Sequence, residues 1–260
     1  MKRKRKLGFG RRLVRLVDDT INFVLFMGLL VMLGFGSYAL WDSKQVFAQA
    51  NVSNYQEFKP TQGEESLSYL ELKALNPDVF GWLTVYGTNI DYPMVQGEDN
   101  MYYVSYDVKK NYCISGSIFL DYMNQRDFSD FNSVFYGHHM AEAAMFGDIG
   151  LFTDEDYFDE RPYGNLYYDG KNHGIEFFAF LETDAYNQEV FATPVEGEKK
   201  QQEYIDNLWE IAMYKRDEIE VTIEDRLVLL STCTSTSTNG RHLLVGKVID
   251  EPFEVPDAFK

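Results

Sequence analysis

The chain has 260 residues, of which 45% are hydrophobic and 16% aromatic. It can bury one substantial core and is too apolar for a disordered or fibrous protein. The net charge is −17: residues 1–20 hold eight Lys and Arg against Asp18 and Asp19, a net of +6, so the remaining 240 residues carry −23. Such an acidic body repels nucleic acid and excludes it as a partner.

Residues 21–41, INFVLFMGLLVMLGFGSYALW, contain no charged side chain. At 1.5 Å per residue they span about 30 Å of hydrocarbon, which predicts a membrane-spanning helix. Basic residues stay cytoplasmic, so residues 1–20 are expected inside the cell and Asp42 onward outside it. A cleaved signal peptide is the alternative, because an A-x-A site ends at Ala50. Signal-peptide apolar regions run about 7 to 15 residues, however, so the sequence favours a retained single-pass anchor.

The extracellular part is expected to hold a stalk and one folded domain. Residues 42–63 lack sustained periodicity and contain Pro60 and Gly63, which predicts a stalk or loosely docked arm. The domain is expected over residues 64–260. Residues 65–77 place leucines at helical spacing, start with Ser and Glu, and end at a proline, so one helix should open the domain.

Short β-type runs separated by turn residues follow this helix. They cover residues 79–88, 91–96, 116–122, 133–139, 165–170, 175–186, 226–232 and 241–249. Eight short strands in one domain favour a closed β-barrel with peripheral helices. Residues 143–160 predict one or two short helices, and residues 199–217 predict a longer amphipathic helix covering the barrel edge. The apolar face of that helix is expected to hold Tyr204, Leu208, Ile211 and Ala212.

Only two cysteines face an oxidising exterior, so the chain is not a disulfide-stapled scaffold. Cys113 and Cys233 could pair with each other, or one could be a working thiol. The sequence around Cys113 is typical of a small buried hydrophobe. Cys233 instead ends an apolar run and precedes seven small polar residues, which suits chemistry better than packing.

Two arrangements of the segment after Cys233 are possible. A tight turn at Asn239-Gly240 would leave Arg241 about 15 Å or more from the thiol. An open loop over residues 234–240 would set Cys233 opposite Arg241. The second arrangement is favoured because apolar side chains stop before the cysteine and resume only after the arginine. A guanidinium there favours the reactive thiolate and can hydrogen-bond an oxyanion.

A base for this thiol must come from the four histidines of the chain. His138 and His139 follow a β-type run and a glycine, where a side chain can reach a cleft. His173 is expected in a hairpin turn, and His242 on the strand face away from Arg241. Zinc is the rival interpretation, but two histidines and one cysteine are a thin ligand set without C-x-x-C or H-E-x-x-H. No metal or cofactor is therefore expected.

Taken together, these residues resemble the sortases, the membrane-anchored cysteine transpeptidases of Gram-positive cell surfaces, and class B most closely. The family's T-L-x-T-C strand end appears as LLSTC, its histidine motif as YGHHM and its arginine strand as RHLLVGKV. DNMYYV, GSIFLD and MFGDI are also similar, and the likeness covers Leu67 to Ile249. The 95 positions from His138 to Cys233 leave room for a helix that class B members carry. Leu229 replaces the motif's first threonine, from which we expect altered substrate preference rather than lost activity.

The resemblance implies that Cys233 is the nucleophile, His138 the acid and base, and Arg241 the oxyanion and substrate clamp. It also implies a peptide groove lined by Tyr136, Ser231, Asn100 and Val104. The expected enzyme cleaves the C-terminal sorting signal of secreted proteins through a thioester acyl-enzyme. It then passes the protein to an amine of the peptidoglycan cross-bridge or of a pilin lysine.

Two other classes remain open on the sequence alone. A non-catalytic membrane-anchored receptor would carry an inert Cys233. An L,D-transpeptidase is also a cysteine enzyme of the wall, but its motif places an arginine directly after the cysteine, where this chain has Thr234.

Overall fold

The structure is a computed structural model that describes residues 9–60, 66–234 and 237–259. The chain divides into two compact units, Met1–Gln45 and Val46–Lys260. The expected domain start at residue 64 lies outside the described residues, whereas the second unit begins at Val46.

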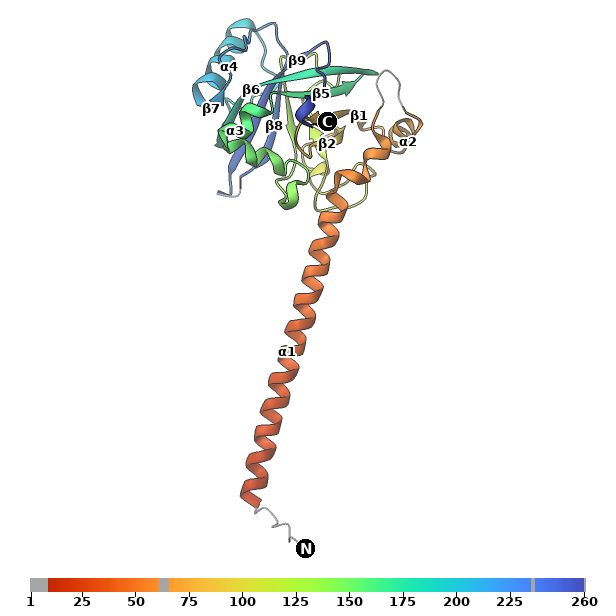
Figure 1. Ribbon diagram of the computed structural model, residues 1–260, viewed down its shortest axis with the longest axis vertical. Coiled ribbons are helices and arrows are strands. Elements are labelled where there is room, and N and C mark those ends of the chain that lie inside the picture. The colour runs from red at the N-terminus through yellow and green to blue at the C-terminus, as the bar shows by residue number, and fades with distance from the viewer. Residues whose placement is uncertain (1–8, 61–65, 235–236, 260) are drawn as a thin grey trace. The chain divides into compact units, whose positions relative to one another are not determined.

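The first unit consists of most of α1, a helix that runs without interruption from Phe9 to Ala50 (Figure 1). Its most apolar window has a mean hydropathy of 2.1, and none of that window is buried. By length and composition the helix can cross a membrane. It continues past the expected end at Trp41 because residues 42–50 contain neither proline nor glycine.

Residues 46–60 of the segment expected as a stalk or loosely docked arm belong to the second unit and pack on its barrel. Two short 3-10 helices lie here, η1 (Val52–Asn54) and η2 (Gln56–Phe58). Ala50 is fully buried, and its carbonyl oxygen accepts a hydrogen bond of 3.0 Å from the hydroxyl of Tyr92. Buried contacts of this kind hold the arm on the barrel. The polar composition of the segment does not predict them.

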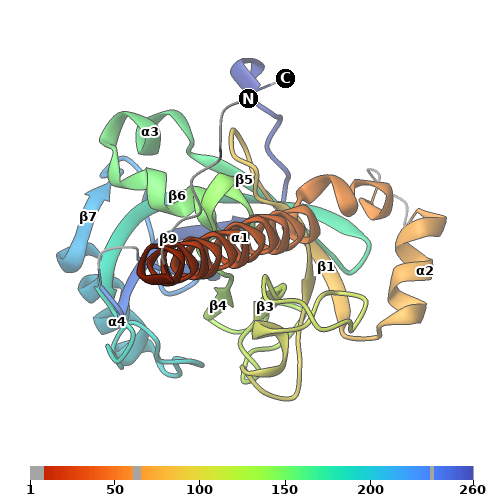
Figure 2. The ribbon, with the colours of Figure 1, turned by 90° about the horizontal axis from the view of Figure 1, so that it is seen from below.

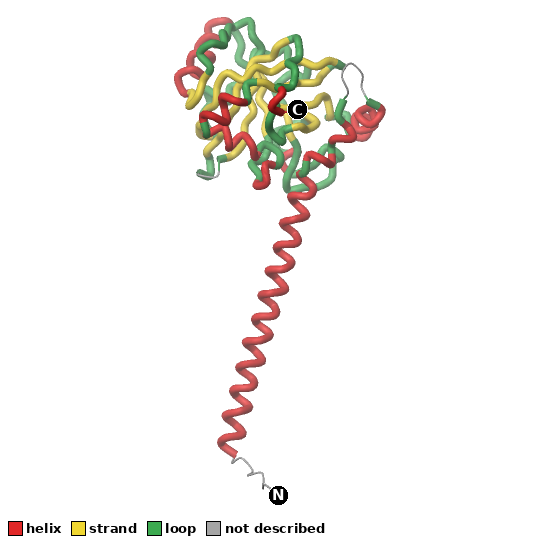
Figure 3. Tube along the Cα trace, viewed as in Figure 1, coloured by secondary structure: helices red, strands yellow, loops and turns green. Residues whose placement is uncertain are grey.

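Over the described residues, nine strands form one sheet in the order β5-β1-β2-β3-β4-β8-β9-β6-β7. A further pairing between β5 and β6 closes eight of them into a barrel and leaves β7 outside, on the edge of β6. This confirms the expected closed barrel of about eight strands with helices around it (Figure 3). The strands are β1 (Val79–Val85), β2 (Asp91–Val95), β3 (Ile118–Leu120), β4 (Asn132–Tyr136), β5 (Tyr163–Tyr168), β6 (Lys171–Asp184), β7 (Ala212–Lys215), β8 (Leu227–Cys233) and β9 (Gly240–Ile249).

The opening helix of the barrel domain is α2 (Leu67–Leu75), and the side chain of Ser66 caps it by accepting the N–H of Tyr69 at 3.1 Å. The face of α2 that packs on the barrel is not the one expected from the spacing of its leucines. Tyr69 and Leu72 are buried, whereas Leu67 is 81% exposed. The tyrosine ring contributes the larger buried area, so it sets the face of this short helix.

The stretch over residues 143–160 forms short helices, as expected. These helices are η5 (Gly147–Thr153) and α3 (Glu155–Glu160), and η4 (Ala141–Ala143) directly precedes them. Two further 3-10 helices lie elsewhere in the domain, η3 (Tyr102–Val104) and η6 (Asp257–Phe259).

The expected helix over residues 199–217 is only partly confirmed. α4 (Glu198–Ile211) buries Tyr204 and Leu208, but Ala212 belongs to β7 and pairs with Leu181 of β6. The open edge of β6 supplies hydrogen-bond partners there, and this tertiary pairing overrides helical periodicity. Figure 2 shows α4 and β7 on one side of the barrel and α2 on the opposite side.

Candidate active site

The first pair of the site lies where β8 and β9 meet. Cys233 is the last residue of β8, and its direct cross-strand partner in β9 is Arg241. The N–H of Thr234 donates to the carbonyl oxygen of Gly240 at 2.9 Å and closes the pairing at the base of the loop. The open-loop arrangement is therefore the observed one, and the tight turn that would separate the thiol from the arginine is excluded.

The third strand end belongs to β4, which runs parallel to β8 with Tyr136 opposite Ser231. The pairing extends beyond the strand, since the N–H of Gly137 donates to the carbonyl oxygen of Ser231 at 3.2 Å. His138 and Cys233 each lie two residues beyond this pair. Because β4 and β8 are parallel neighbours, the two residues are side by side at the ends of these strands. The sheet order β4-β8-β9 thus gathers the histidine, the cysteine and the arginine at one end of the barrel.

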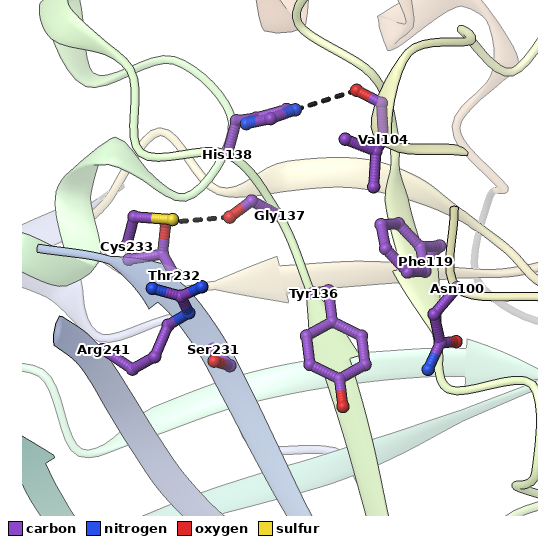
Figure 4. Close-up of a pocket in the computed structure, with 10 residues that line it drawn as sticks. All are labelled: Asn100, Val104, Phe119, Tyr136, Gly137, His138, Ser231, Thr232, Cys233 and Arg241. Carbon is purple, nitrogen blue, oxygen red and sulfur yellow. Dashed lines mark hydrogen bonds between the residues drawn. The ribbon is translucent and has the colours of Figure 1, made fainter. Parts of the chain in front are cut away.

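The imidazole of His138 has a fixed orientation. Its Nε2 lies 2.8 Å from the carbonyl oxygen of Val104 (Figure 4). A carbonyl oxygen only accepts, so Nε2 carries a proton in this hydrogen bond, and the neutral ring has its free lone pair on Nδ1. Val104 therefore determines which ring nitrogen can accept a proton.

A cavity of about 260 Å³ lies over these strand ends. All seven site residues predicted from the sequence line this cavity, the three catalytic and the four groove residues. Three further lining residues had no role assigned, although each lies inside a quoted motif: Phe119 in GSIFLD, Gly137 in YGHHM and Thr232 in LLSTC. The ten lining residues are Asn100, Val104, Phe119, Tyr136, Gly137, His138, Ser231, Thr232, Cys233 and Arg241.

The cavity has a polar end away from the thiol (Figure 4). There the hydroxyl of Tyr136 donates to Asp121 Oδ2 at 3.0 Å. Burial raises the pKa of Tyr136 above its usual range, and the negative charge of Asp121 and this hydrogen bond raise it further. Tyr136 is consequently a neutral phenol. Near it, Ser231 Oγ is buried without a hydrogen-bond partner among the described residues.

The second cysteine lies outside this site. Cys113 is 4% exposed, and its Sγ lies 2.8 Å from Ser115 Oγ. Both cysteines are free thiols, and Cys233 is the exposed one. The open alternative of a Cys113–Cys233 disulfide is therefore excluded.

The other histidines do not line the cavity. His173 lies in β6 opposite Leu166 and stacks on Tyr168 with ring centroids 4.0 Å apart, so its expected place in a hairpin turn is wrong. The turn precedes it, at Asp169 and Gly170. His242 is 7% exposed, and burial lowers its pKa below 6.5.

Comparison with known proteins shows which proteins share this sequence and fold. No family model matches the chain. Sortase B of Listeria monocytogenes is 33% identical over 192 residues, which are 72% of this chain and 76% of that protein. The crystal structure of sortase B from the type II pilus of Streptococcus pneumoniae is 46% identical with a TM-score of 0.61, covering 70% of this chain and 98% of that one. A Streptococcus pyogenes class B sortase involved in pilus biogenesis is 35% identical with a TM-score of 0.64, covering 71% and 100%.

The closed barrel and these similarities define the chain as a sortase, and sortases are cysteine transpeptidases. Within them, this chain belongs to class B.

Proposed function

We propose that this sortase cleaves the C-terminal sorting signal of secreted proteins and joins them to an amine of the cell wall or of a pilin. The observation that carries the proposal is the cross-strand pair of Cys233 and Arg241 in one cavity with His138. The exposure of Cys233 supports it further, since a nucleophile has to be reached by its substrate.

In the proposed first half-reaction, the Cys233 thiolate attacks the carbonyl carbon of the scissile peptide bond. The guanidinium of Arg241 donates hydrogen bonds to the oxyanion that forms. His138, as the imidazolium that pairs with the thiolate, then gives its Nδ1 proton to the leaving amine and becomes neutral, while Nε2 stays bound to Val104. The C–N bond breaks, the tail departs, and the substrate is left as a thioester on Cys233.

The second half-reaction runs the same groups in reverse. An incoming amine gives a proton to Nδ1 of His138 and attacks the thioester carbonyl. The C–S bond breaks, and the thiolate of Cys233 is restored. The acceptor is a peptidoglycan cross-bridge amine or a pilin lysine, and two of the relatives described above belong to pilus systems. The acidic body suits a cationic amine, although solubility accounts for its charge equally well.

The peptide is proposed to lie along the cavity between the thiol and the polar end. Val104 offers an apolar wall, and Ser231 offers a hydroxyl without an internal partner among the described residues. Tyr136 and Asn100 form the far end. These four side chains are the proposed groove residues.

The chain is proposed to keep its helix as a single-pass anchor, with residues 1–20 cytoplasmic, residues 21–41 in the membrane and the barrel outside the cell. Cleavage after Ala50 would remove residues 1–50, including residues 46–50 of the second unit, and Ala50 is fully buried there. Its carbonyl oxygen also accepts the Tyr92 hydroxyl. These contacts support retention.

The decisive experiment incubates the full-length protein in detergent with a panel of sorting peptides and measures the intact mass. We expect a wild-type adduct that carries the amino-terminal part of one peptide and is absent from Cys233→Ala. Iodoacetamide at neutral pH tests the receptor alternative. One label on native protein, at Cys233 and not at buried Cys113, supports an enzyme. No adduct with any peptide, together with an unlabelled Cys233, would overturn the proposed function.

A further inference from the structure

Asp121 follows β3 directly and lies behind the polar end of the cavity rather than in its lining. It is 5% exposed and forms no ion pair within the part of the chain that the structure describes. Its Oδ2 accepts the side-chain amide of Asn100 at 2.7 Å and the Tyr136 hydroxyl at 3.0 Å. Its Oδ1 accepts the N–H of Met123 at 2.9 Å. A buried carboxylate is costly unless hydrogen bonds compensate it, and here three donors do so.

Asp121 determines which atoms of Tyr136 are available to a ligand. An ionised carboxylate only accepts, so the Tyr136 hydroxyl has to donate to it and presents its oxygen as an acceptor. The ring itself is held between neighbouring aromatic rings, with centroids 5.4 Å from Phe119 and 6.4 Å from Phe191. Packing therefore fixes the plane of the ring, and Asp121 fixes the direction of the O–H bond.

Asp121 fixes the amide of Asn100 in the same way. Asn100 Nδ2 donates to Asp121, and Asn100 Oδ1 accepts the N–H of Tyr122 at 3.0 Å. Both ends of the amide are thus engaged, so a flip would break two hydrogen bonds. The other N–H of Nδ2 has no acceptor among the described residues and can donate to a ligand. Figure 4 shows the Tyr136 hydroxyl and the Asn100 amide at the same end of the cavity, away from Cys233.

We propose that Asp121 is a positioning residue that holds Tyr136 as an acceptor and Asn100 as a donor at the far end of the peptide groove. It sets the affinity for the peptide without touching it and without taking part in the chemistry at Cys233. The inference rests on the proposed function, because it assigns a role in that function's substrate groove.

The test is Asp121→Asn in the full-length protein in detergent, assayed with the peptide that gives the wild-type adduct. Asparagine keeps the shape, but its single amide oxygen is uncharged and cannot replace both carboxylate oxygens. With that oxygen at the Oδ2 position it accepts from Asn100 and Tyr136 more weakly than the carboxylate, and with the amide nitrogen there both side-chain donors lose their acceptor. We expect KM to rise about tenfold, which corresponds to about 1.4 kcal/mol, with kcat within about twofold of wild type. The rate of Cys233 alkylation by iodoacetamide should stay unchanged.

Asp130→Asn is the matched control. Asp130 Oδ2 also accepts a side-chain amide, from Asn124 at 2.8 Å, and a backbone N–H, from Gln125 at 2.7 Å. Neither Asp130 nor its partners Asn124 and Gln125 line the cavity, so the KM of this variant should equal that of wild type. If Asp121 acts only through its two partners, Asp121→Asn should add nothing to the KM of an Asn100→Ala/Tyr136→Phe variant. A rise in KM that persists in that background, or an unchanged KM in Asp121→Asn alone, would overturn the inference.

A second measurement needs no turnover. The side-chain amide resonances of Asn100, assigned by their loss in Asn100→Asp, should shift in Asp121→Asn and stay in place in Asp130→Asn. Resonances unmoved by Asp121→Asn would overturn the inference. A wild type that forms no adduct with any peptide and leaves Cys233 unlabelled would instead overturn the proposed function, and the resonance comparison would then decide on its own whether Asp121 orients Asn100.

Discussion

The hydroxyl of Thr232 donates a hydrogen bond of 2.8 Å to the carbonyl oxygen of Gly137. Each of these residues directly precedes a proposed catalytic residue, Thr232 before Cys233 and Gly137 before His138. The bond therefore ties together the two strand ends that carry the thiol and the imidazole.

Thr232→Val should remove this hydrogen bond while keeping the shape of the side chain. Thr232 is 2% exposed, so the Gly137 carbonyl loses a buried donor, and we expect a loss of about 1–3 kcal/mol in the free energy of unfolding. The rate of adduct formation should fall about tenfold, because the thiol and the imidazole lose their fixed separation. Thr232→Ser keeps the hydroxyl and is the control. Equal activity of the Val and Ser variants would contradict the prediction.

Arg241→Lys should separate the charge of the arginine from its forked geometry. Lysine keeps a positive charge but cannot donate two parallel hydrogen bonds. We expect kcat with the sorting peptide to fall by about 10²–10³, the usual effect of losing an oxyanion donor. Alkylation of Cys233 by iodoacetamide forms no oxyanion, so its rate should change little. A parallel loss in both assays would show that Arg241 acts on the thiol rather than on the oxyanion.

Asp91 should hold the arm over residues 46–60 on the barrel. Its carboxylate accepts hydrogen bonds from Trp82 at 2.7 Å and Thr84 at 2.8 Å within the barrel, and from Gln56 and Lys59 at 2.8 Å each in the arm. Asp91→Ala should lower the free energy of unfolding by about 2–4 kcal/mol, since it leaves several donors unpaired.

Lys59→Met separates the ion pair from the rest of this network. The lysine side chain is 38% exposed, so its loss should cost less than about 1 kcal/mol. Urea unfolding of both variants in detergent, with proteolysis of the arm as a second readout, checks the ranking. Equal destabilisation by the two substitutions would assign the stability to the ion pair alone.

The free energy of unfolding should fall as the pH drops below 6.5, in part because of His242. Burial lowers the pKa of His242 below 6.5, the Glu182 carboxylate opposes this, and His139 adds to it. The folded state then binds fewer protons than the unfolded state between the lowered pKa and 6.5, so stability rises with pH in that window. Urea titrations at several pH values should show a shallower slope for His242→Gln. His173, whose pKa burial also lowers, keeps part of the slope in that variant; an unaltered slope would contradict the assignment.

The end of the barrel that holds the proposed site could be predicted because its signals are local. Apolar side chains end before Cys233 and resume after Arg241, and this pattern alone favoured the observed cross-strand pair. The eight β-type runs likewise matched the barrel, because alternation and turn residues lie within each run.

Features that depend on distant partners could not be predicted in this way. Asp121 reads as one acidic residue after a strand, and its partners Asn100 and Tyr136 are 21 and 15 residues away. Ala212 continues a helical pattern, and only the free edge of β6 makes it a strand residue. The docked arm depends on Asp91, more than 30 residues from both arm side chains that it accepts.

The order of the strands also bears on how the protein is made. Among the described residues β9 is the last strand in chain order, yet it lies in the sheet between β8 and β6. A chain synthesised from its amino end cannot set Arg241 beside Cys233 until this final strand has been inserted. Until then the site lacks the proposed oxyanion donor, so we expect the unfinished enzyme to be acylated only after β9 has paired with β8.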